Sequence, residues 1–179
     1  IPHEWVASVK KCVADIASNF TTNRMLIDYE ERFYDKLAAR KRKLSADSCL
    51  LAREIAAWKR KVSAAWDQVR AVDVERVKID KEAVCVGEKY RFSVTVDIAN
   101  LRPEDIGVEM VIARQIVGGQ GVNVVRTIRL ERTRTDNNLV TYALDYTPDE
   151  TGTFDVALRI YPCNPHLPHR MDFALVKWA

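Results

Sequence analysis

Residues 90–98 read Tyr-Arg-Phe-Ser-Val-Thr-Val-Asp-Ile, and this stretch decides the fold class of the second half of the chain. Apolar and polar side chains alternate along it, and the apolar ones are Tyr90, Phe92, Val94, Val96 and Ile98. A period of two places these side chains on one face of a β-strand. The sequence therefore predicts a half-buried strand of the kind found in antiparallel sheets.

Comparable apolar runs recur on both sides of this stretch. They cover residues 108–116, 124–132, 139–146, 153–161 and 171–178, with weaker runs at 72–79 and 84–86. Clusters of turn-forming residues separate them, at residues 102–105, 118–121, 136–138 and 148–152. Short strands at this spacing predict an antiparallel, immunoglobulin-like β-sandwich. No helical pattern alternates with the strands, which argues against a parallel α/β sheet.

The segment Pro148–Phe154 adds a fold signal of its own. It resembles the corner of immunoglobulin-like domains, where an Asp-x-Gly-x-Tyr sequence turns the chain into a core strand. Phe154 stands where the tyrosine would be, so the hydroxyl hydrogen bond of that corner cannot form. The segment indicates a fold and says little about function.

The first part of the chain has a different, helical character. The apolar spacing predicts about three helices, over residues 3–18, 23–43 and 47–70. Thr21 or Thr22 can cap the second helix, and Ser45 or Asp47 can cap the third. The third helix has an apolar stripe expected to be buried, made of Leu51, Ile55, Trp58, Val62, Trp66 and Val69.

The change of character marks a predicted domain boundary near residue 72. All six glycines and five of the six prolines follow it. The predicted fold class is therefore α+β, with a helical segment at 1–72 and a β-sandwich at 73–179. Net charge also differs, being +5 before the boundary and −2 after it.

Composition excludes several classes of protein. The chain has 179 residues, of which 47% are hydrophobic and 30% charged, as in globular domains that bury a core. No run of about 18 apolar residues occurs, so no membrane span is expected. The N-terminus lacks the pattern of a signal peptide and an initiator methionine, which leads us to expect a piece of a longer chain. The four cysteines are far apart in sequence, so free thiols are expected, although a disulfide stays possible.

The densest basic cluster is Arg40-Lys41-Arg42-Lys43. Such a cluster could contact phosphates, but cations near the C-terminal end of a helix are also stabilised by the helix dipole. No nucleic-acid-binding motif accompanies it, so no nucleic-acid partner is expected.

Catalytic and cofactor-binding residues are not apparent. Phosphate chemistry needs a cradle of backbone N–H groups, often glycine-rich, and residues 1–86 contain no glycine. The cluster Gly118-Gly119-Gln120-Gly121 lies between predicted strands and favours a hairpin loop. Lys59 and Lys61 fall on the polar side of the third helix, where solvated charges are expected rather than Schiff-base lysines.

A metal site is also not expected. Cys163, His166 and His169 have a Cys-x-x-His-x-x-His spacing that zinc could use, but two prolines stiffen the segment and no fourth ligand is evident. The carboxylate pairs Glu30-Glu31 and Asp149-Glu150 fall in a solvated helix face and a turn.

Aromatic side chains could form platforms for sugar rings. The four tryptophans are Trp5, Trp58, Trp66 and Trp178. Trp58 and Trp66 lie on the apolar stripe of the third helix, and Trp178 ends an apolar strand, so packing is favoured for these three. The other aromatic residues mostly follow strand alternation, which favours a structural β domain over a glucan-binding one.

Both ends of the chain resemble one enzyme family. The run Phe20-Thr21-Thr22-Asn23-Arg24, with Trp5 before it and Tyr29 after it, resembles the C-terminal end of the α-glucan (glycogen/starch) phosphorylases. The proline-rich loop at 161–170, followed by Leu-Val-Lys-Trp-Ala at 175–179, is similar to the end of a bacterial and archaeal subgroup. Residues 56–59 and 65–66 resemble the linking helix of that subgroup.

The resemblance implies that this chain is a non-catalytic C-terminal fragment with a scaffolding or assembly role. Its parent would be a cytoplasmic, pyridoxal-phosphate-dependent enzyme that phosphorolyses α-1,4-glucan to glucose 1-phosphate. None of the family's catalytic or cofactor residues transfers to these positions. The implied partners are the upstream catalytic domains and, through the N-terminal helices, further copies of the chain. A stand-alone carbohydrate- or protein-binding β-sandwich module is the alternative.

Overall fold

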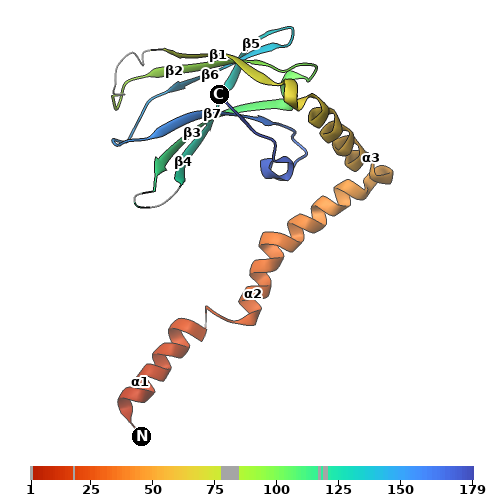
Figure 1. Cartoon of the computed structure of the whole chain (residues 1–179). Coiled ribbons are helices and arrows are strands. Elements are labelled where there is room, and N and C mark those ends of the chain that lie inside the picture. The colour runs from red at the N-terminus through yellow and green to blue at the C-terminus, as the bar shows by residue number, and fades with distance from the viewer. Residues whose placement is uncertain (1, 18, 78–84, 117, 119–120) are drawn as a thin grey trace. The chain divides into compact units, whose positions relative to one another are not determined.

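The computed structural model describes residues 2–17, 19–77, 85–116, 118 and 121–179. The chain forms two compact units, Ile1–Ile55 and Ala56–Ala179, which are described separately (Figure 1). The first unit is helical and the second contains all the described strands.

The first unit begins with helix α1, His3–Cys12, which continues into a π-helical turn at Val13–Ala17. Helix α2, Thr22–Tyr29, starts at a capped end, because the Thr21 Oγ1 atom accepts a hydrogen bond of 3.2 Å from the Arg24 N–H. The expected threonine cap is confirmed. A second π-helical turn, Glu30–Tyr34, leads directly into helix α3, Asp35–Ala65.

The expected division into about three helices is not confirmed. Helical structure runs from Thr22 through Ala65, where the sequence predicted one helix ending at 43 and another starting at 47. The break falls inside α3 at Ala46–Cys49, where Asp47, Ser48 and Cys49 all have positive φ angles. A short left-handed turn therefore bends the helical path.

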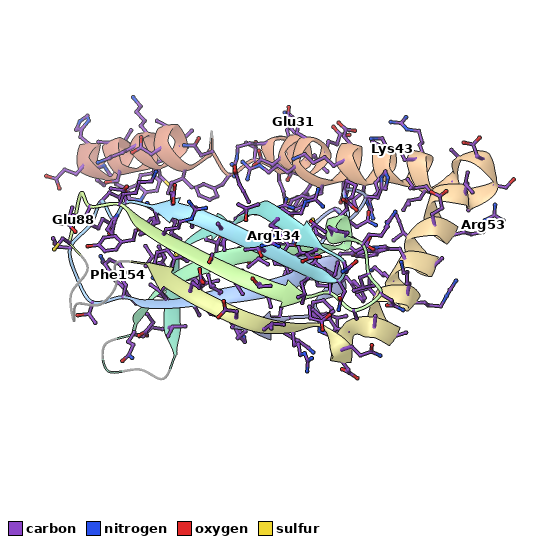
Figure 2. All side chains as sticks on the ribbon, turned by 90° about the horizontal axis from the view of Figure 1, so that it is seen from above. Glu31, Lys43, Arg53, Glu88, Arg134 and Phe154 are labelled. Carbon is purple, nitrogen blue, oxygen red and sulfur yellow. The ribbon has the colours of Figure 1, made fainter. Side chains whose placement is uncertain are left out.

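Apolar side chains of the first unit are left uncovered. No residue of α1 or α2 is buried. Trp5, Val9, Val13 and Ile16 recur at helical spacing and are all exposed. The charged side chains Glu31, Lys43 and Arg53 extend outward from their helices (Figure 2).

The second unit is built from two four-stranded antiparallel sheets that follow the end of α3 and a 3₁₀ turn at Trp66–Gln68. Sheet A has the order β1 (Arg70–Val77), β2 (Tyr90–Asp97), β6 (Leu139–Tyr146), β5 (Glu131–Asp136). Sheet B has the order β4 (Val122–Arg129), β3 (Ile106–Gln115), β7 (Asp155–Pro162), β8 (Lys177–Trp178). Figure 1 shows the two sheets as separate layers.

One hydrophobic core joins the two sheets and the end of α3. Sheet A contributes alternate residues such as Val94 and Val140, and sheet B contributes Val108 and Ile160. Helix α3 and the turn after it contribute Trp58, Val62, Ala65, Trp66 and Val69. The predicted burial of the stripe is confirmed except at Leu51, which is half-buried.

This packing explains why the compact units divide between Ile55 and Ala56, inside α3, although composition changes near residue 72. The last turns of α3 pack in the core of the second unit, although their composition is that of the helical segment. The domain ranges 1–72 and 73–179 stay a prediction.

Several strand boundaries differ from the sequence pattern. The predicted run at 124–132 is two strands, β4 in sheet B and β5 in sheet A. Leu130 lies between them, is buried, and donates its N–H to the Val108 carbonyl at 2.9 Å. The chain passes from sheet B to sheet A without a turn, so its apolar pattern is not interrupted. The sequence therefore shows the two strands as one run.

The C-terminal run was also predicted as too long a strand. The first part of residues 171–178 lies in a 3₁₀ turn, Arg170–Phe173, and pairing with β7 begins only at Lys177 and continues to Ala179. At the weak run 84–86, Cys85 and Val86 are not in a strand, and residue 84 lies outside the described residues. A further 3₁₀ turn, Pro103–Asp105, occupies the predicted turn before β3.

Candidate functional site

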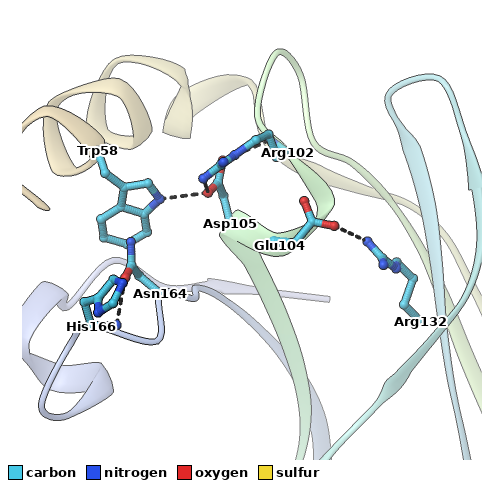
Figure 3. Close-up of polar contacts among 7 residues, drawn as sticks. All are labelled: Trp58, Arg102, Glu104, Asp105, Arg132, Asn164 and His166. Carbon is cyan, nitrogen blue, oxygen red and sulfur yellow. Dashed lines mark hydrogen bonds and ion pairs between the residues drawn. The ribbon is translucent and has the colours of Figure 1, made fainter. Parts of the chain in front are cut away.

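A buried polar site joins the end of α3 to the turn before β3 (Figure 3). The Trp58 indole Nε1 donates to Asp105 Oδ1 at 2.9 Å, and the Arg102 Nη2 donates to the same oxygen at 2.9 Å. The Arg102 backbone N–H and side-chain Nε donate to Asp105 Oδ2, at 3.0 and 3.2 Å. Only 2% of the Asp105 surface is exposed, so four donors satisfy a carboxylate that water scarcely reaches.

The surroundings of Asp105 also set its acidity. Burial by itself would raise the pKa of this carboxyl, because the charged form loses hydration. The hydrogen bonds from Arg102 and Trp58 outweigh burial and lower the pKa below its ordinary value. The site is thus a charged structural contact that holds α3 against the sheets.

The C-terminal segment packs onto the same end of α3. The Lys59 Nζ donates to the Asp172 carbonyl at 2.8 Å and forms an ion pair with its carboxylate at 3.2 Å. The Trp58 and Phe173 rings meet edge to face, with centroids 5.4 Å apart. Lys59, expected to be a solvated charge, is instead paired across 113 positions of sequence.

A second polar cluster lies on the outer face of sheet B. Val108, Met110 and Ile112 of β3 point into the core, so the alternate residue Glu109 points away from it. Glu109 is directly opposite Arg159 on β7 and Arg129 on β4. Arg159 Nε donates to Glu109 Oε1 at 2.5 Å, and Arg170 Nη1 donates to Glu109 Oε2.

Two aromatic rings flank this cluster. Trp178 pairs with Arg159 in the sheet and is 58% exposed, with the Arg159 guanidinium 5.7 Å from its ring centroid. Tyr161, two residues after Arg159, lies across Gly107 on β3. Burial raises the pKa of the Tyr161 hydroxyl, Arg129 and Arg170 oppose this, and Glu109 adds to the rise.

These positions correct one sequence prediction. Trp58 and Trp66 are buried in the core as expected, and Trp5, on the apolar face of the first helix, is exposed. Trp178 was expected to pack inside, but its strand partner Arg159 points outward. Ile160 is an apolar core residue between Arg159 and Tyr161, so strand alternation could have shown that Arg159 and Tyr161 share the outer face. The sequence does not show that Trp178 pairs with Arg159.

A cavity of about 820 Å³ opens at one end of the two sheets. Its aromatic lining consists of Tyr90, Phe92, Tyr146 and Phe154. Cys85 and Val86 also border it, directly after residues 78–84, which lie outside the described residues. A smaller cavity of about 440 Å³ holds Tyr142, whose pKa burial raises to about 12.

The carboxylates of the corner segment have cationic partners. Asp149 accepts from Arg126 at 3.0 Å and Glu150 accepts from Arg114 at 3.1 Å. The Arg114 guanidinium also lies 4.4 Å from the centroid of the Phe154 ring. These exposed pairs tie the corner to strands β3 and β4. Of the predicted hairpin loop 118–121, Gly119 and Gln120 lie outside the described residues.

The Cys163, His166 and His169 positions take part in other contacts. The Cys163 sulfur accepts a hydrogen bond from Arg129 at 3.5 Å, and His169 Nδ1 accepts from the Met171 N–H at 3.1 Å. The His166 backbone N–H donates to the Asn164 side chain (Figure 3). Within the described residues, no three His, Cys, Asp or Glu side chains come together as a metal site.

The other residues singled out from the sequence are dispersed. Lys41, Arg42 and Lys43 are exposed on α3, Lys61 is exposed, and Glu30 and Glu31 are exposed in the second π turn. The four cysteines are free thiols. In the part of the chain that the structure describes, no helix has the length and apolar character needed to cross a membrane.

Comparison with known proteins places this arrangement in a family. The family model for the glycogen phosphorylase C-terminal domain matches residues 66–179, which contain every described strand. The chain belongs to this family. The match begins at Trp66, where α3 has just ended.

Named relatives extend the similarity beyond the family domain. The chain is 30% identical over 178 residues to a maltodextrin phosphorylase of Thermococcus litoralis, covering 97% of this chain and 20% of the relative. It is 26% identical over its whole length to a glycogen phosphorylase of Mycobacterium tuberculosis, covering 21% of that protein. The chain therefore spans about a fifth of the relatives it matches. No solved structure matches it.

Proposed function

We propose that this chain is the C-terminal, non-catalytic part of an α-glucan phosphorylase. The observation that carries the proposal is the match to the glycogen phosphorylase C-terminal domain, together with similarity to phosphorylases along the whole chain. The parent enzyme transfers a terminal α-1,4-linked glucose of a glucan to phosphate and releases glucose 1-phosphate. We also place that parent in the cytoplasm.

The parent is expected to use pyridoxal phosphate, which the residues described here do not fit. Such a site needs a reactive lysine beside a cradle for the cofactor phosphate. The Lys59 amine is hydrogen-bonded to Asp172. We therefore place the cofactor, and every chemical step, upstream of this chain.

The local role that we propose is scaffolding. The exposed apolar stripe of α1, with Trp5, Val9 and Val13, is a surface for the preceding domains of the same polypeptide. The same stripe would drive self-association when the fragment is separated from them.

The strand order also supports an immunoglobulin-like arrangement of the β unit. The order β1-β2-β6-β5 corresponds to strands A, B, E and D of that fold, and β3, β7 and β8 correspond to C, F and G. Domains of this architecture serve many unrelated functions, so the topology supports a compact module and identifies no activity.

The complete open reading frame tests the proposal. We expect it to encode upstream catalytic domains, and the full-length enzyme to produce glucose 1-phosphate from glucan and phosphate. The 179-residue chain alone should form no product and show no absorbance band of a lysine-bound cofactor. A reading frame that starts near Ile1, or phosphorolysis by the pure chain, would refute the proposal.

A further inference from the structure

The outer face of sheet B carries two aromatic rings that face away from the core. The Tyr161 side chain lies flat on the sheet because Gly107 beneath it has no Cβ atom. A Cβ built at Gly107 would stand 2.6 Å from Tyr161 Cζ, closer than real contacts allow. One face of this ring therefore rests on the backbone at Gly107, and Tyr161 as a whole is half-buried. Trp178, on the adjacent edge strand β8, is 58% exposed.

Fixed polar groups stand beside the two rings. Arg159 is directly opposite Trp178, and Tyr161 follows two residues later on the same face, so Arg159 lies beside both aromatic positions. Glu109 holds Arg159 and Arg170, and its own side chain is only 5% exposed. A guanidinium has five N–H donors, and these contacts use only some of them. The donors of Arg159 and Arg170 are thus oriented before any ligand arrives.

Near Tyr161 and Trp178 the exposed carbon of this face is aromatic, whereas the exposed aliphatic residues Val122 and Val124 lie opposite Gln115 and Ala113, at the other end of β3. The aliphatic residues Val111 and Ala113, which follow Glu109 on the outward side of β3, are buried. A protein interface of ordinary size needs a wider apolar centre than two rings and buried aliphatics provide. Aromatic faces next to planar hydrogen-bonding groups match a pyranose, which has apolar C–H faces and a rim of hydroxyls.

We propose that this surface, formed by Gly107, Glu109, Arg159, Tyr161, Arg170 and Trp178, binds an α-glucan chain. Sugar rings stack on Trp178 and Tyr161, while their hydroxyls bond to Arg159 and Arg170, which Glu109 holds in place. The choice of α-glucan among carbohydrates rests on the proposed function. In this proposal the surface anchors the polymer.

Affinity electrophoresis of the complete 179-residue chain tests the proposal, in native gels with and without glycogen. We expect glycogen to retard the wild-type chain. Trp178→Ala and Tyr161→Ala should each raise the apparent dissociation constant by up to about tenfold, the usual scale for losing one aromatic contact. Trp5→Ala is the matched control, because it removes a tryptophan that is 65% exposed in the other unit.

A third variant tests the geometry of the platform. Gly107→Ala keeps both aromatic residues and every polar group, yet its methyl group displaces the Tyr161 ring from the sheet. We expect weaker retardation with an unchanged circular dichroism spectrum. If this variant fails to fold, the Tyr161→Ala and Trp178→Ala results decide.

Three outcomes would overturn the inference. The first is unchanged wild-type mobility in gels that contain glycogen. The second is equal retardation of wild type and the two aromatic variants, and the third is a loss of retardation in Trp5→Ala as large as theirs. A protein partner for this face would give the first outcome. Phosphorolysis by the full-length enzyme is measured in parallel. If the full-length enzyme is active but glycogen does not retard the 179-residue chain, only the glucan-binding surface is refuted. If glycogen retards the chain but the reading frame encodes no catalytic domains, only the proposed function is refuted.

Discussion

Asp105 illustrates how one residue can hold two elements together. Its carboxylate receives the indole N–H of Trp58 from α3 and three N–H groups of Arg102 from the neighbouring turn. Removing one partner of such a buried contact leaves a polar group unsatisfied, which costs more than the bond itself contributes. The contact therefore fixes where α3 meets the sheets.

The lowered pKa of Asp105 leads to a prediction about acid stability. A carboxyl whose folded pKa lies below its unfolded value, about 3.9, stabilises the fold above that pH. This contribution disappears as the pH falls through the folded pKa. Asp105→Asn should therefore be less stable than wild type at pH 7, and the difference should shrink below about pH 4.

Urea unfolding at a series of pH values measures this difference. Asp155→Asn, at an exposed position, serves as the control and should follow the wild-type profile. A gap between wild type and Asp105→Asn that stays constant down to the lowest pH would contradict the prediction.

At the scale of elements, α3 is both a helix of the first unit and part of the core of the second. Its last turns place Trp58, Val62 and Ala65 in the β core, and the following 3₁₀ turn adds Trp66. Trp66 is 6% exposed. A helix gains most of its stability from packing of this kind rather than from intrinsic propensity.

Replacing Trp66 tests how strongly this end is anchored. Trp66→Ala should lower the free energy of unfolding of the second unit by about 3–5 kcal/mol, because it opens a large cavity. Trp5→Ala, at an exposed position, should change it by less than about 0.5 kcal/mol. Denaturant unfolding measures both, and a loss below about 1 kcal/mol for Trp66→Ala would place this side chain outside the core.

The bend inside α3 gives a prediction about backbone strain. Ser48 has a φ of 54°, a left-handed conformation that costs residues other than glycine about 1–2 kcal/mol. Ser48→Gly should therefore raise the thermal midpoint followed by circular dichroism. Ala46→Gly, at a φ of −62°, relieves no such strain and should lower it. Equal shifts in the two variants would show that the left-handed turn stores no strain.

The sequence predicted individual helices and strands better than it predicted which of them pair or pack together. Period-two runs located β2 and β6, and the stripe of α3 gave the buried tryptophans, because these patterns depend on local burial alone. The change of sheet at Leu130 and the contact of Trp58 with Asp105 depend on residues far apart in the chain. For the same reason the outward pairing of Trp178 with Arg159 could not be read from the sequence.

At the scale of the whole molecule, the exposed stripe of α1 predicts association. We expect the separated chain to form dimers or larger species through Trp5, Val9 and Val13, since uncovered apolar stripes drive such contacts. The double variant Val9→Glu with Val13→Glu should shift the chain to monomer in light scattering. Ser8→Glu, an exposed polar position on the same helix, should not. A wild-type chain that is monomeric at high concentration would contradict this prediction.

The interleaved order of the two sheets has a consequence for how the chain acquires its structure during synthesis. The central strand β2 pairs with β6, with Tyr90 opposite Tyr146, and β3 pairs with β7, with Ile106 opposite Pro162. Both central strands therefore leave the ribosome well before their partners exist. Sheet A cannot close until β6 ends at Tyr146, and sheet B cannot close until β7 and β8 are made. Pairing over such distances makes folding slow, typically milliseconds to seconds. In that interval β2 and β3 expose unpaired edges, so chaperone binding should concentrate on nascent chains that end between these strands and β7.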